Sequence, residues 1–287
     1  MGSPPQTAPM QRSNPTRQVL ICSLIIGSTP LFCGVKMDVR EGRPVVDGVF
    51  VNGHGPYRFL VDTGSNINLI EAGLARKIGM NATFQVDLAS SSGKTVAVGS
   101  DRNEIAVDSA KAGEQRILFS KLEAIHNRMP DVQGVLGQWF LVRFDYVLDL
   151  HGKRIEFGMP QQGGTRAPFK WVNARPVVST SLGDLALDSG SARLVLFGVQ
   201  PGNDPGSKAE LRTLAGSQQI GKVFRTLLIE SRKLWEGGAV AIPNRPEPGV
   251  DGLMPLAFFK SIYFCNSQGY VVFDANNLPG RRSPFSE

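Results

Sequence analysis

A short pattern that occurs twice constrains this chain more than any other feature of its sequence. The turn Asp62–Ser65 reads DTGS, the turn Asp188–Ser191 reads DSGS, and each follows a short apolar strand pattern. Two further landmarks recur in the same order, an RPVV tetrapeptide before each turn and a hydrophobic-Gly step after it, at Arg43–Val46 with Gly134–Gly137 and at Arg175–Val178 with Asp251–Pro255. The RPVV copies, the Asp turns and the glycine steps are separated by 132, 126 and 118 residues. This ordered repeat indicates two homologous lobes.

Local patterns within each lobe predict mainly strands. Val45–Val51 and Tyr57–Val61 flank the turn Asn52–Gly55, which is typical of a β-hairpin. Short helices are expected just after the two Asp turns, at Glu71–Ile78 and Lys208–Leu214. Each lobe then ends in an aromatic-rich short helix followed by a strand, in residues 139–157 and 258–273. The sequence therefore predicts a mainly all-β fold with a few short helices.

The composition agrees with such a fold and argues against some classes of partner. The 287 residues include 32 glycines and 19 prolines, which favours many turns between short elements over a helical bundle. The net charge of +6 is mild, and the basic residues are scattered without interleaved aromatics, so we expect no nucleic-acid partner. Cys265 is the only cysteine beyond residue 33, so no internal disulfide is expected. We expect a monomer.

The N-terminal segment differs from the rest of the chain. Residues 1–18 carry two arginines and no acid, and residues 19–35 then run without a charge. A basic stretch followed by an apolar one predicts a secretory signal peptide or a signal anchor. A buried core strand is the alternative, although the apolar run exceeds the usual strand length. The sequence thus predicts export to the periplasm or the medium, either released or anchored to the membrane through residues 19–35.

The repeat and the apolar segment together set the expected domain boundaries. Residues 1–36 form the signal segment and residues 37–160 the N-terminal lobe. A linker rich in Gly and Pro occupies residues 161–172, and residues 173–287 form the C-terminal lobe.

Each Asp turn has a composition that suits a reactive carboxylate. Burial of the preceding apolar strand places Asp62 and Asp188 at the edge of the core, and Gly64 and Gly190 permit the two turns to approach closely. Two carboxylates about 3 Å apart share one proton, so that one acts as a base and the other as an acid. A water held between them would attack a peptide carbonyl without a covalent intermediate. This chemistry requires no cofactor and no metal.

The hydroxyl residues of the turns have separate expected roles. Thr63 and Ser189 are placed to hydrogen-bond across to the partner turn. Ser65 and Ser191 are placed to donate to the outer oxygens of the two carboxylates.

These two turns, with a hydrophobic-Gly step downstream of each, resemble the pepsin and retropepsin superfamily of aspartic peptidases, particularly its compact bacterial members. The resemblance covers about residues 40–275. It implies a bilobal pepsin-like acid protease fold, two β-barrel-like lobes with a cleft between them, and aspartic endopeptidase activity on peptide or protein substrates. By the match, Asp62 and Asp188 take the catalytic positions. The supporting positions fall to Thr63, Gly64, Ser65, Ser189, Gly190 and Ser191.

One departure from the pepsin pattern keeps an alternative open. Pepsin-like enzymes cover the cleft with a hairpin flap that bears a tyrosine, whereas residues 90–108 contain no tyrosine or tryptophan. Lys94–Ser100 is the expected flap tip and strand. A peptidase fold that binds peptides or a partner protein without turnover is therefore the alternative, although both turns keep all four of their positions. A dimer that pairs two chains through Asp62 is a third reading, which the intact second turn disfavours.

The remaining candidate residues point to no other chemistry. The three histidines, His54, His126 and His151, are not spaced as metal ligands. The Gly-x-Ser-x-Gly pattern of serine hydrolases is absent. Arg193 lies close to the second Asp turn, where it either points inward and keeps that carboxylate ionised or faces solvent, and the exposed orientation is favoured.

Overall fold

The computed structural model describes residues 34–90, 93–158, 163–200, 209–213 and 216–275. Nearly all of the expected signal segment, residues 1–36, lies outside this range, so export and anchoring stay predictions. Among the residues that the structure describes, no helix is long and apolar enough to cross a membrane.

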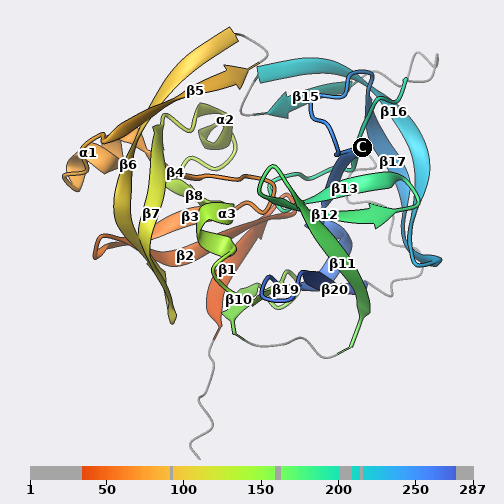
Figure 1. Cartoon of the computed structure of the whole chain (residues 1–287), viewed down its shortest axis with the longest axis horizontal. Coiled ribbons are helices and arrows are strands. Elements are labelled where there is room, and N and C mark those ends of the chain that lie inside the picture. The colour runs from red at the N-terminus through yellow and green to blue at the C-terminus, as the bar shows by residue number, and fades with distance from the viewer. Residues whose placement is uncertain (1–33, 91–92, 159–162, 201–208, 214–215, 276–287) are drawn as a thin grey trace, which may run out of the picture. The chain divides into compact units, whose positions relative to one another are not determined.

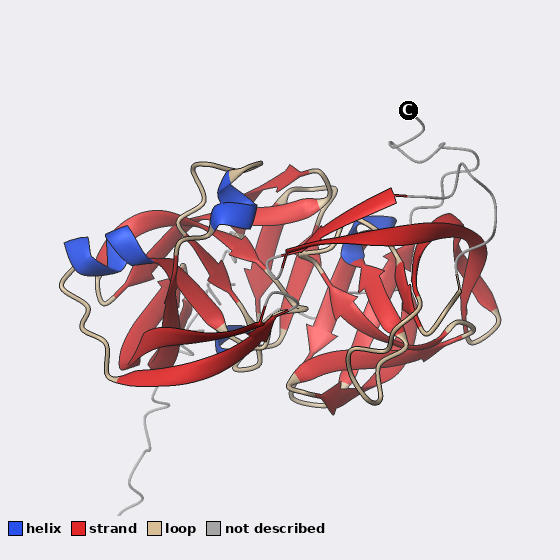
Figure 2. Ribbon diagram, turned by 90° about the horizontal axis from the view of Figure 1, so that it is seen from above, coloured by secondary structure: helices blue, strands red, loops and turns tan. Residues whose placement is uncertain are grey.

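Strands dominate both halves of the described chain, and they follow each other in the same order in each half (Figures 1 and 2). The N-terminal half contains β1 (Val35–Arg40), β2 (Arg43–Val51), β3 (His54–Val61), β4 (Asn68–Glu71), β5 (Phe84–Ser90), β6 (Gly93–Val107), β7 (Ala110–Ser120), β8 (Gly134–Leu136), β9 (Tyr146–Asp149) and β10 (Arg154–Phe157). The C-terminal half contains β11 (Thr165–Val172), β12 (Arg175–Thr180), β13 (Gly183–Asp188), β14 (Val195–Phe197), β15 (Ala209–Thr213), β16 (Gly216–Ile229), β17 (Arg232–Ile242), β18 (Gly252–Pro255), β19 (Phe259–Cys265) and β20 (Tyr270–Ala275). The helices are α1 (Ala72–Lys77), α2 (Glu123–His126), α3 (Gln138–Leu141) and the 3₁₀ turn η2 (Leu256–Phe258).

Strand pairing within the two lobes follows one scheme. β3 pairs in parallel with β8, and β13 pairs in parallel with β18. β4 pairs in parallel with β7 and antiparallel with β8, and the same relations hold for β14 with β17 and β18. The repeat seen in the sequence is therefore a repeat of structure, and the prediction of two similar, strand-rich lobes is confirmed.

The strand that leads into each Asp turn is apolar because both of its faces are buried. Phe59 and Val61 of β3 pack in the main hydrophobic core, whereas Leu60 on the opposite face packs in a second cluster. In β13, Leu185 and Leu187 join the main core, and the alternating residue between them packs in a separate cluster. Such a strand holds its last residue at the edge of the core in one orientation.

A sheet that draws strands from both lobes joins them. Antiparallel pairing runs from β1 through β10, β9, β19 and β20 to β11. Each lobe supplies three strands in equivalent positions. The two halves of this sheet therefore correspond to each other in the same way as the two lobes. Its inner side carries large buried aromatic side chains, including Tyr146 and Phe264, whose rings stack with centroids 4.8 Å apart.

Two local expectations were wrong. Lys208–Leu214 was expected to be helical, but residues 209–213 form β15, which pairs antiparallel with β16. Alanine, glutamate, leucine and arginine favour helices in isolation, and the pairing overrides this weak preference. The expected linker, residues 161–172, is also shorter, because Thr165–Val172 is β11 and pairs with both β20 and β12.

Other expected elements are confirmed. The hairpin around residues 52–55 joins β2 to β3, and helix α1 lies within the expected range Glu71–Ile78. Each lobe also has a short helical turn, α3 or η2, directly after its hydrophobic-Gly step.

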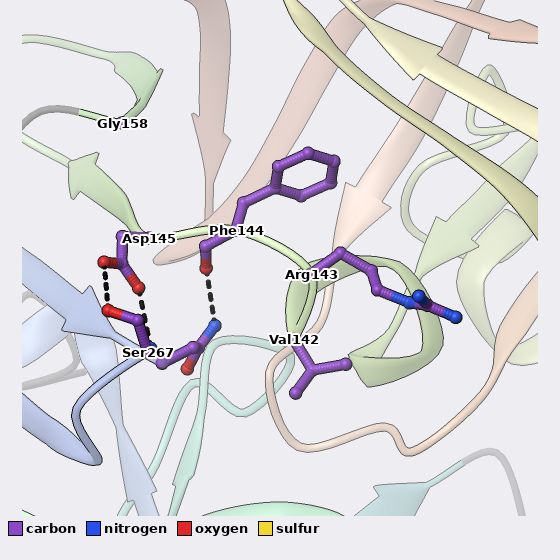
Figure 3. A pocket seen from close by; sticks show the side chains of 7 residues that line it. Val142, Arg143, Phe144, Asp145, Gly158 and Ser267 are labelled. Atoms are coloured by element: carbon purple, nitrogen blue, oxygen red, sulfur yellow. Dashed lines mark hydrogen bonds between the residues drawn. The ribbon is translucent and has the colours of Figure 1, made fainter.

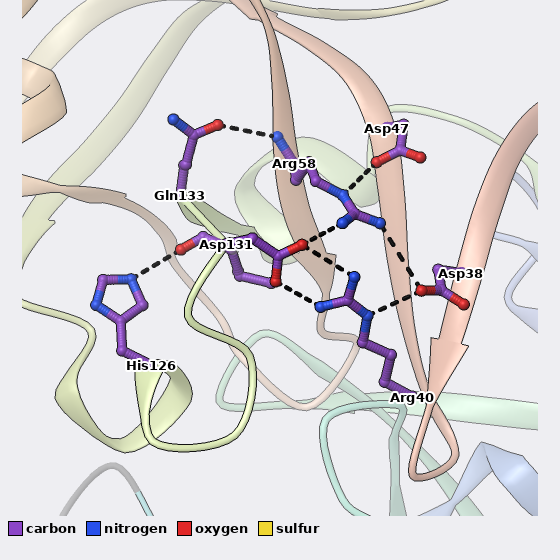
Figure 4. Close-up of polar contacts among 8 residues, drawn as sticks. Asp38, Arg40, Asp47, Arg58, His126, Asp131 and Gln133 are labelled. Atoms are coloured by element: carbon purple, nitrogen blue, oxygen red, sulfur yellow. Dashed lines mark hydrogen bonds and ion pairs between the residues drawn. The ribbon is translucent and has the colours of Figure 1, made fainter.

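A network of ion pairs ties the β1–β2 hairpin of the first lobe to the loop before β8 (Figure 4). Arg40 binds Asp131 through two hydrogen bonds, of 2.5 and 2.9 Å, and also contacts Asp38 at 2.8 Å. Arg58 on β3 joins the network through Asp131 and through Asp47, the latter at 2.5 Å. The hydrogen bond from Arg40 holds the pKa of Asp131 down at about 2, below its ordinary value of 3.8.

Replacing Asp131 with asparagine is expected to lower the free energy of unfolding by roughly 1 kcal/mol at neutral pH, because the carboxylate is 38% exposed and its attraction to the arginines is screened. A lowered folded-state pKa contributes stability above the unfolded-state value, and this contribution is lost as the pH falls from 3.8 towards 2. Urea unfolding at several pH values would therefore show the wild type and the variant converging in acid. Glu123→Gln is the control, since its ion pair with Lys121 is longer and highly exposed. A difference between wild type and Asp131→Asn that persists unchanged at low pH would contradict this account.

Candidate active site

The two Asp turns meet through four hydrogen bonds between the lobes, all made by Thr63 and Ser189. The Thr63 hydroxyl donates to the carbonyl of Leu187 (2.8 Å) and accepts from the backbone N–H of Ser189 (3.0 Å). The Ser189 hydroxyl donates to the carbonyl of Val61 (2.6 Å) and accepts from the backbone N–H of Thr63 (2.9 Å). Both side chains are 0% exposed. The expectation that these two hydroxyls bridge the turns is confirmed.

The glycine of each turn lies against the carboxylate of the other. A Cβ atom added to Gly64 would lie 2.5 Å from Cγ of Asp188, and one added to Gly190 would lie 2.6 Å from Oδ2 of Asp62. Real Cβ atoms do not approach so closely, so no larger residue fits at either position without displacing a carboxylate. The glycines are thus required by the close approach of the turns rather than by an unusual backbone angle.

Each carboxylate accepts hydrogen bonds from the backbone of its own turn, and the two also affect each other's pKa. Oδ1 of Asp62 accepts hydrogen bonds from the backbone N–H groups of Gly64 (3.0 Å) and Ser65 (3.2 Å), and Oδ1 of Asp188 accepts one from the N–H of Ser191 (2.9 Å). Burial raises the pKa of Asp62 above 3.8, and the charge of Asp188 raises it further. Burial also raises the pKa of Asp188, opposed by hydrogen bonds from backbone N–H groups. Side-chain hydrogen bonding with Asp188 also raises the pKa of Asp62, as expected for two carboxyl groups that interact closely.

The expected role of the Ser65 and Ser191 hydroxyls was wrong. The Ser65 hydroxyl donates to the carbonyl of Ile67 (3.0 Å), and the Ser191 hydroxyl donates to the carbonyl of Arg193 (2.8 Å). Backbone N–H groups of the same serines reach the carboxylates instead, because the turn directs the main chain inward. The hydroxyls therefore brace the chain that leaves each turn.

Arg193, for which two orientations were open, has an exposed side chain. The favoured solvent-facing orientation is confirmed.

Sequence reasoning missed three residues that support the turns. The buried Gln138 donates from Nε2 to the carbonyl of Thr63 (2.8 Å). Arg43 donates from Nε to the carbonyl of Gly190 (2.7 Å), and Arg175 exerts its charge on Asp188. The sequence does carry a signal for the two arginines, since each opens one of the repeated RPVV tetrapeptides.

The hairpin in the expected flap position is formed by β5 and β6, which pair antiparallel from Phe84 and Gly99 to Ser90 and Gly93. The expected flap segment Lys94–Ser100 lies within β6. Residues 91–92 at the tip lie outside the described range. At the base of the hairpin, the guanidinium of Arg116 lies over the rings of Phe84 (4.1 Å) and Trp139 (5.0 Å).

A pocket of about 400 Å³ lies elsewhere and contains no residue of the Asp turns (Figure 3). Its carboxylate, Asp145, accepts hydrogen bonds from the backbone N–H (2.9 Å) and the hydroxyl (2.6 Å) of Ser267. Figure 3 shows Arg143 directed away from this pair. No histidine of the described chain lines this pocket to act as a base between Asp145 and the Ser267 hydroxyl. Among the described residues, no group of three or more His, Cys, Asp or Glu side chains is arranged to hold a metal ion.

Comparisons with known proteins give one family match and two similar structures. Residues 48–140 match the model of the aspartyl protease family. The fold resembles that of an aspartic proteinase from Irpex lacteus, with a TM-score of 0.51 and 13% identity over 85% of this chain and 97% of the other. A retropepsin-like aspartic protease from Rickettsia conorii matches with a TM-score of 0.33 and 18% identity, over 44% of this chain and 88% of the other. A search of curated protein sequences finds no match.

Proposed function

We propose that this chain, which resembles the pepsin and retropepsin-like aspartic proteases in its family match and in its bilobal fold, is an aspartic endopeptidase with Asp62 and Asp188 as its catalytic pair. The observation that carries the proposal is the meeting of two half-buried aspartate carboxyl groups, one from each lobe, each lying against the glycine of the other turn. Such a pair is expected to share a single proton. A structural role alone would not explain why two acids face each other across the junction of the two turns.

In the proposed reaction, each part of the turns has a task. Thr63 and Ser189 fix the distance between the lobes, and the turn glycines leave room for the opposite carboxylates. The ionised carboxylate accepts a proton from a water molecule as the water oxygen attacks the peptide carbonyl carbon. The protonated carboxyl donates its proton to the carbonyl oxygen, so the pair again holds one proton when the tetrahedral intermediate has formed. Return of a proton to the leaving nitrogen then completes cleavage.

The hairpin of β5 and β6 is the element available to cover the bound peptide. It bears no tyrosine in the described strands, so substrate closure would depend on backbone contacts or on other side chains. Substrates with an extended backbone suit such a hairpin, because strand-like peptides hydrogen-bond through their main chain. Unfolded proteins are therefore the first substrates to test.

Cleavage of an unfolded protein is expected to give a bell-shaped pH profile that extends well above the ordinary aspartate pKa of 3.8, because burial raises the pKa of both carboxyl groups. Activity requires one proton on the pair. It should therefore decline as the pH rises through the raised pKa of Asp62, and also in strong acid when both groups are protonated. The measurement is kcat/KM for a quenched-fluorescence peptide between strong acid and mild alkali.

A statine-type peptide, which imitates the tetrahedral intermediate, should inhibit the reaction. Tight peptide binding without cleavage at any pH would instead support the alternative of a binding module. A rate that rises through neutrality and stays high in alkali would contradict a mechanism based on a singly protonated pair.

A further inference from the structure

Arg175 stands opposite the second catalytic carboxylate in the strand register. β12 and β13 pair with Val177 opposite Ala186. Continuing this antiparallel register by two residues in each strand places Arg175 across from Asp188. Residues two apart on a strand share a face, so both side chains leave the sheet on the same side. The position follows from the repeat, since Arg175 opens the RPVV tetrapeptide.

The guanidinium of Arg175 is held in place next to the dyad. Its side chain is only 11% exposed, and Nη2 forms an ion pair with Glu247 in the loop before β18. Asn173 also donates to that carboxylate, at 3.2 Å. Among the described residues, Glu247 is the one carboxylate that forms an ion pair with Arg175. The positive charge of Arg175 also lowers the pKa of the neighbouring Asp188, which burial raises.

The equivalent arginine of the first lobe is engaged differently. The same register places Arg43 opposite Asp62, yet its Nε donates across the lobe boundary to the carbonyl of Gly190 (2.7 Å). Its Nη1 contacts Glu41 (3.1 Å), which also pairs with Arg128 at 2.5 Å. The two halves of a nearly symmetric site are thus electrostatically unequal.

We propose that Arg175 is a positioning residue that polarises the dyad, keeping Asp188 as the carboxylate base and leaving the shared proton on Asp62, the acid. The inference about catalysis rests on the proposed function, whereas the location of the proton does not. In the first step the proton of the attacking water passes to Asp188, and Asp62 gives its own proton to the carbonyl oxygen.

The charged groups around Asp188 come from several elements and define the controls. Asp62 faces it from the first turn, and Arg43 binds the carbonyl of Gly190 in its own turn. Arg193 follows two residues after the turn but is exposed. The acidic partners of the two half-buried arginines are Glu41 and Glu247.

The test combines carboxyl titration with kinetics. In protein labelled with ¹³C at the aspartate carboxyls, Arg175→Gln should raise the lower apparent pKa of the dyad by about half a unit to one unit. Arg175→Lys, which keeps the charge, should restore most of the wild-type titration. Arg193→Gln removes an equal but exposed charge and should shift it far less. In the cleavage assay, the acidic limb of the pH–rate profile should move to higher pH by the same amount, and only in Arg175→Gln.

A second variant keeps the proposal testable even if Arg175→Gln does not fold. Glu247→Gln retains Arg175 but removes its acidic partner, so the lower apparent pKa should fall instead of rising. An unchanged or raised pKa in Glu247→Gln, an unshifted titration in folded Arg175→Gln, or a failure of Arg175→Lys to restore it would overturn the proposal. If the wild type cleaves no substrate while the titrations move as expected, the proposed peptidase function fails and the polarisation of the pair stands.

Discussion

Replacing either Asp62 or Asp188 with asparagine is expected to reduce kcat for peptide cleavage by at least about 10²- to 10⁴-fold, the range that a positioned acid or base contributes. Asparagine matches aspartate in shape but neither accepts the water proton nor donates one to the carbonyl oxygen. Both single variants should fail alike, since one group cannot replace the other when the two share a single proton. The measurement is single-turnover cleavage of a fluorogenic peptide at the optimum pH of the wild type.

The same two variants should fold normally, which separates lost chemistry from lost structure. A carboxyl whose folded-state pKa is raised loses its stabilising contribution as the pH rises through that pKa. Neutral asparagine avoids this loss, so the melting temperature of Asp62→Asn should equal or exceed that of the wild type above neutral pH. Asp108→Asn is a matched control, because Asp108 is exposed and has a positive φ of 51°, a conformation that asparagine tolerates. Full activity in either dyad variant would remove Asp62 and Asp188 from the mechanism.

The meeting of the two turns could be predicted because the turn occurs twice in the sequence. A single Asp-hydroxyl-Gly-Ser turn has many uses in proteins, whereas two copies in register with other landmarks imply two lobes that face each other. The bridging roles of Thr63 and Ser189 followed from that arrangement. They depend only on the turns meeting, and the turns meet because both preceding strands are buried on two faces.

Features that depend on distant packing could not be predicted in the same way. Residues 209–213 have helix-favouring side chains, and only their partner strand β16 makes them a strand. The residue types of the turns suggest that the Ser65 and Ser191 hydroxyls donate to the carboxylates. In the structure the direction of each turn brings the backbone N–H groups of these serines to the carboxylates instead. The partner of Arg175 is Glu247, seventy-two residues further along the chain, and no local pattern joins them.

The hydroxyl bridge between the turns should be the most sensitive structural element of the chain. Thr63→Val preserves the shape of the side chain but removes both hydrogen bonds of the hydroxyl, leaving the Leu187 carbonyl and the Ser189 N–H without partners in a fully buried site. Each buried group left unsatisfied costs about 1–3 kcal/mol, so the free energy of unfolding should fall by about 2–5 kcal/mol. Ser189→Ala should have a similar effect through the Val61 carbonyl and the Thr63 N–H. Urea unfolding measures both.

Conservative exchanges distinguish the hydrogen bonds from the packing. Thr63→Ser keeps the hydroxyl and loses only a methyl group, so it should cost about 1 kcal/mol and retain cleavage. The double variant Thr63→Val with Ser189→Ala should cost less than the two single changes together, because each hydroxyl accepts from the backbone N–H of the other residue and the bonds form one network. Activity should fall further than stability alone explains, since loss of the bridge frees the two carboxylates to separate. A Thr63→Val variant as stable as Thr63→Ser would show instead that packing, not the hydroxyl bridge, holds the two turns together.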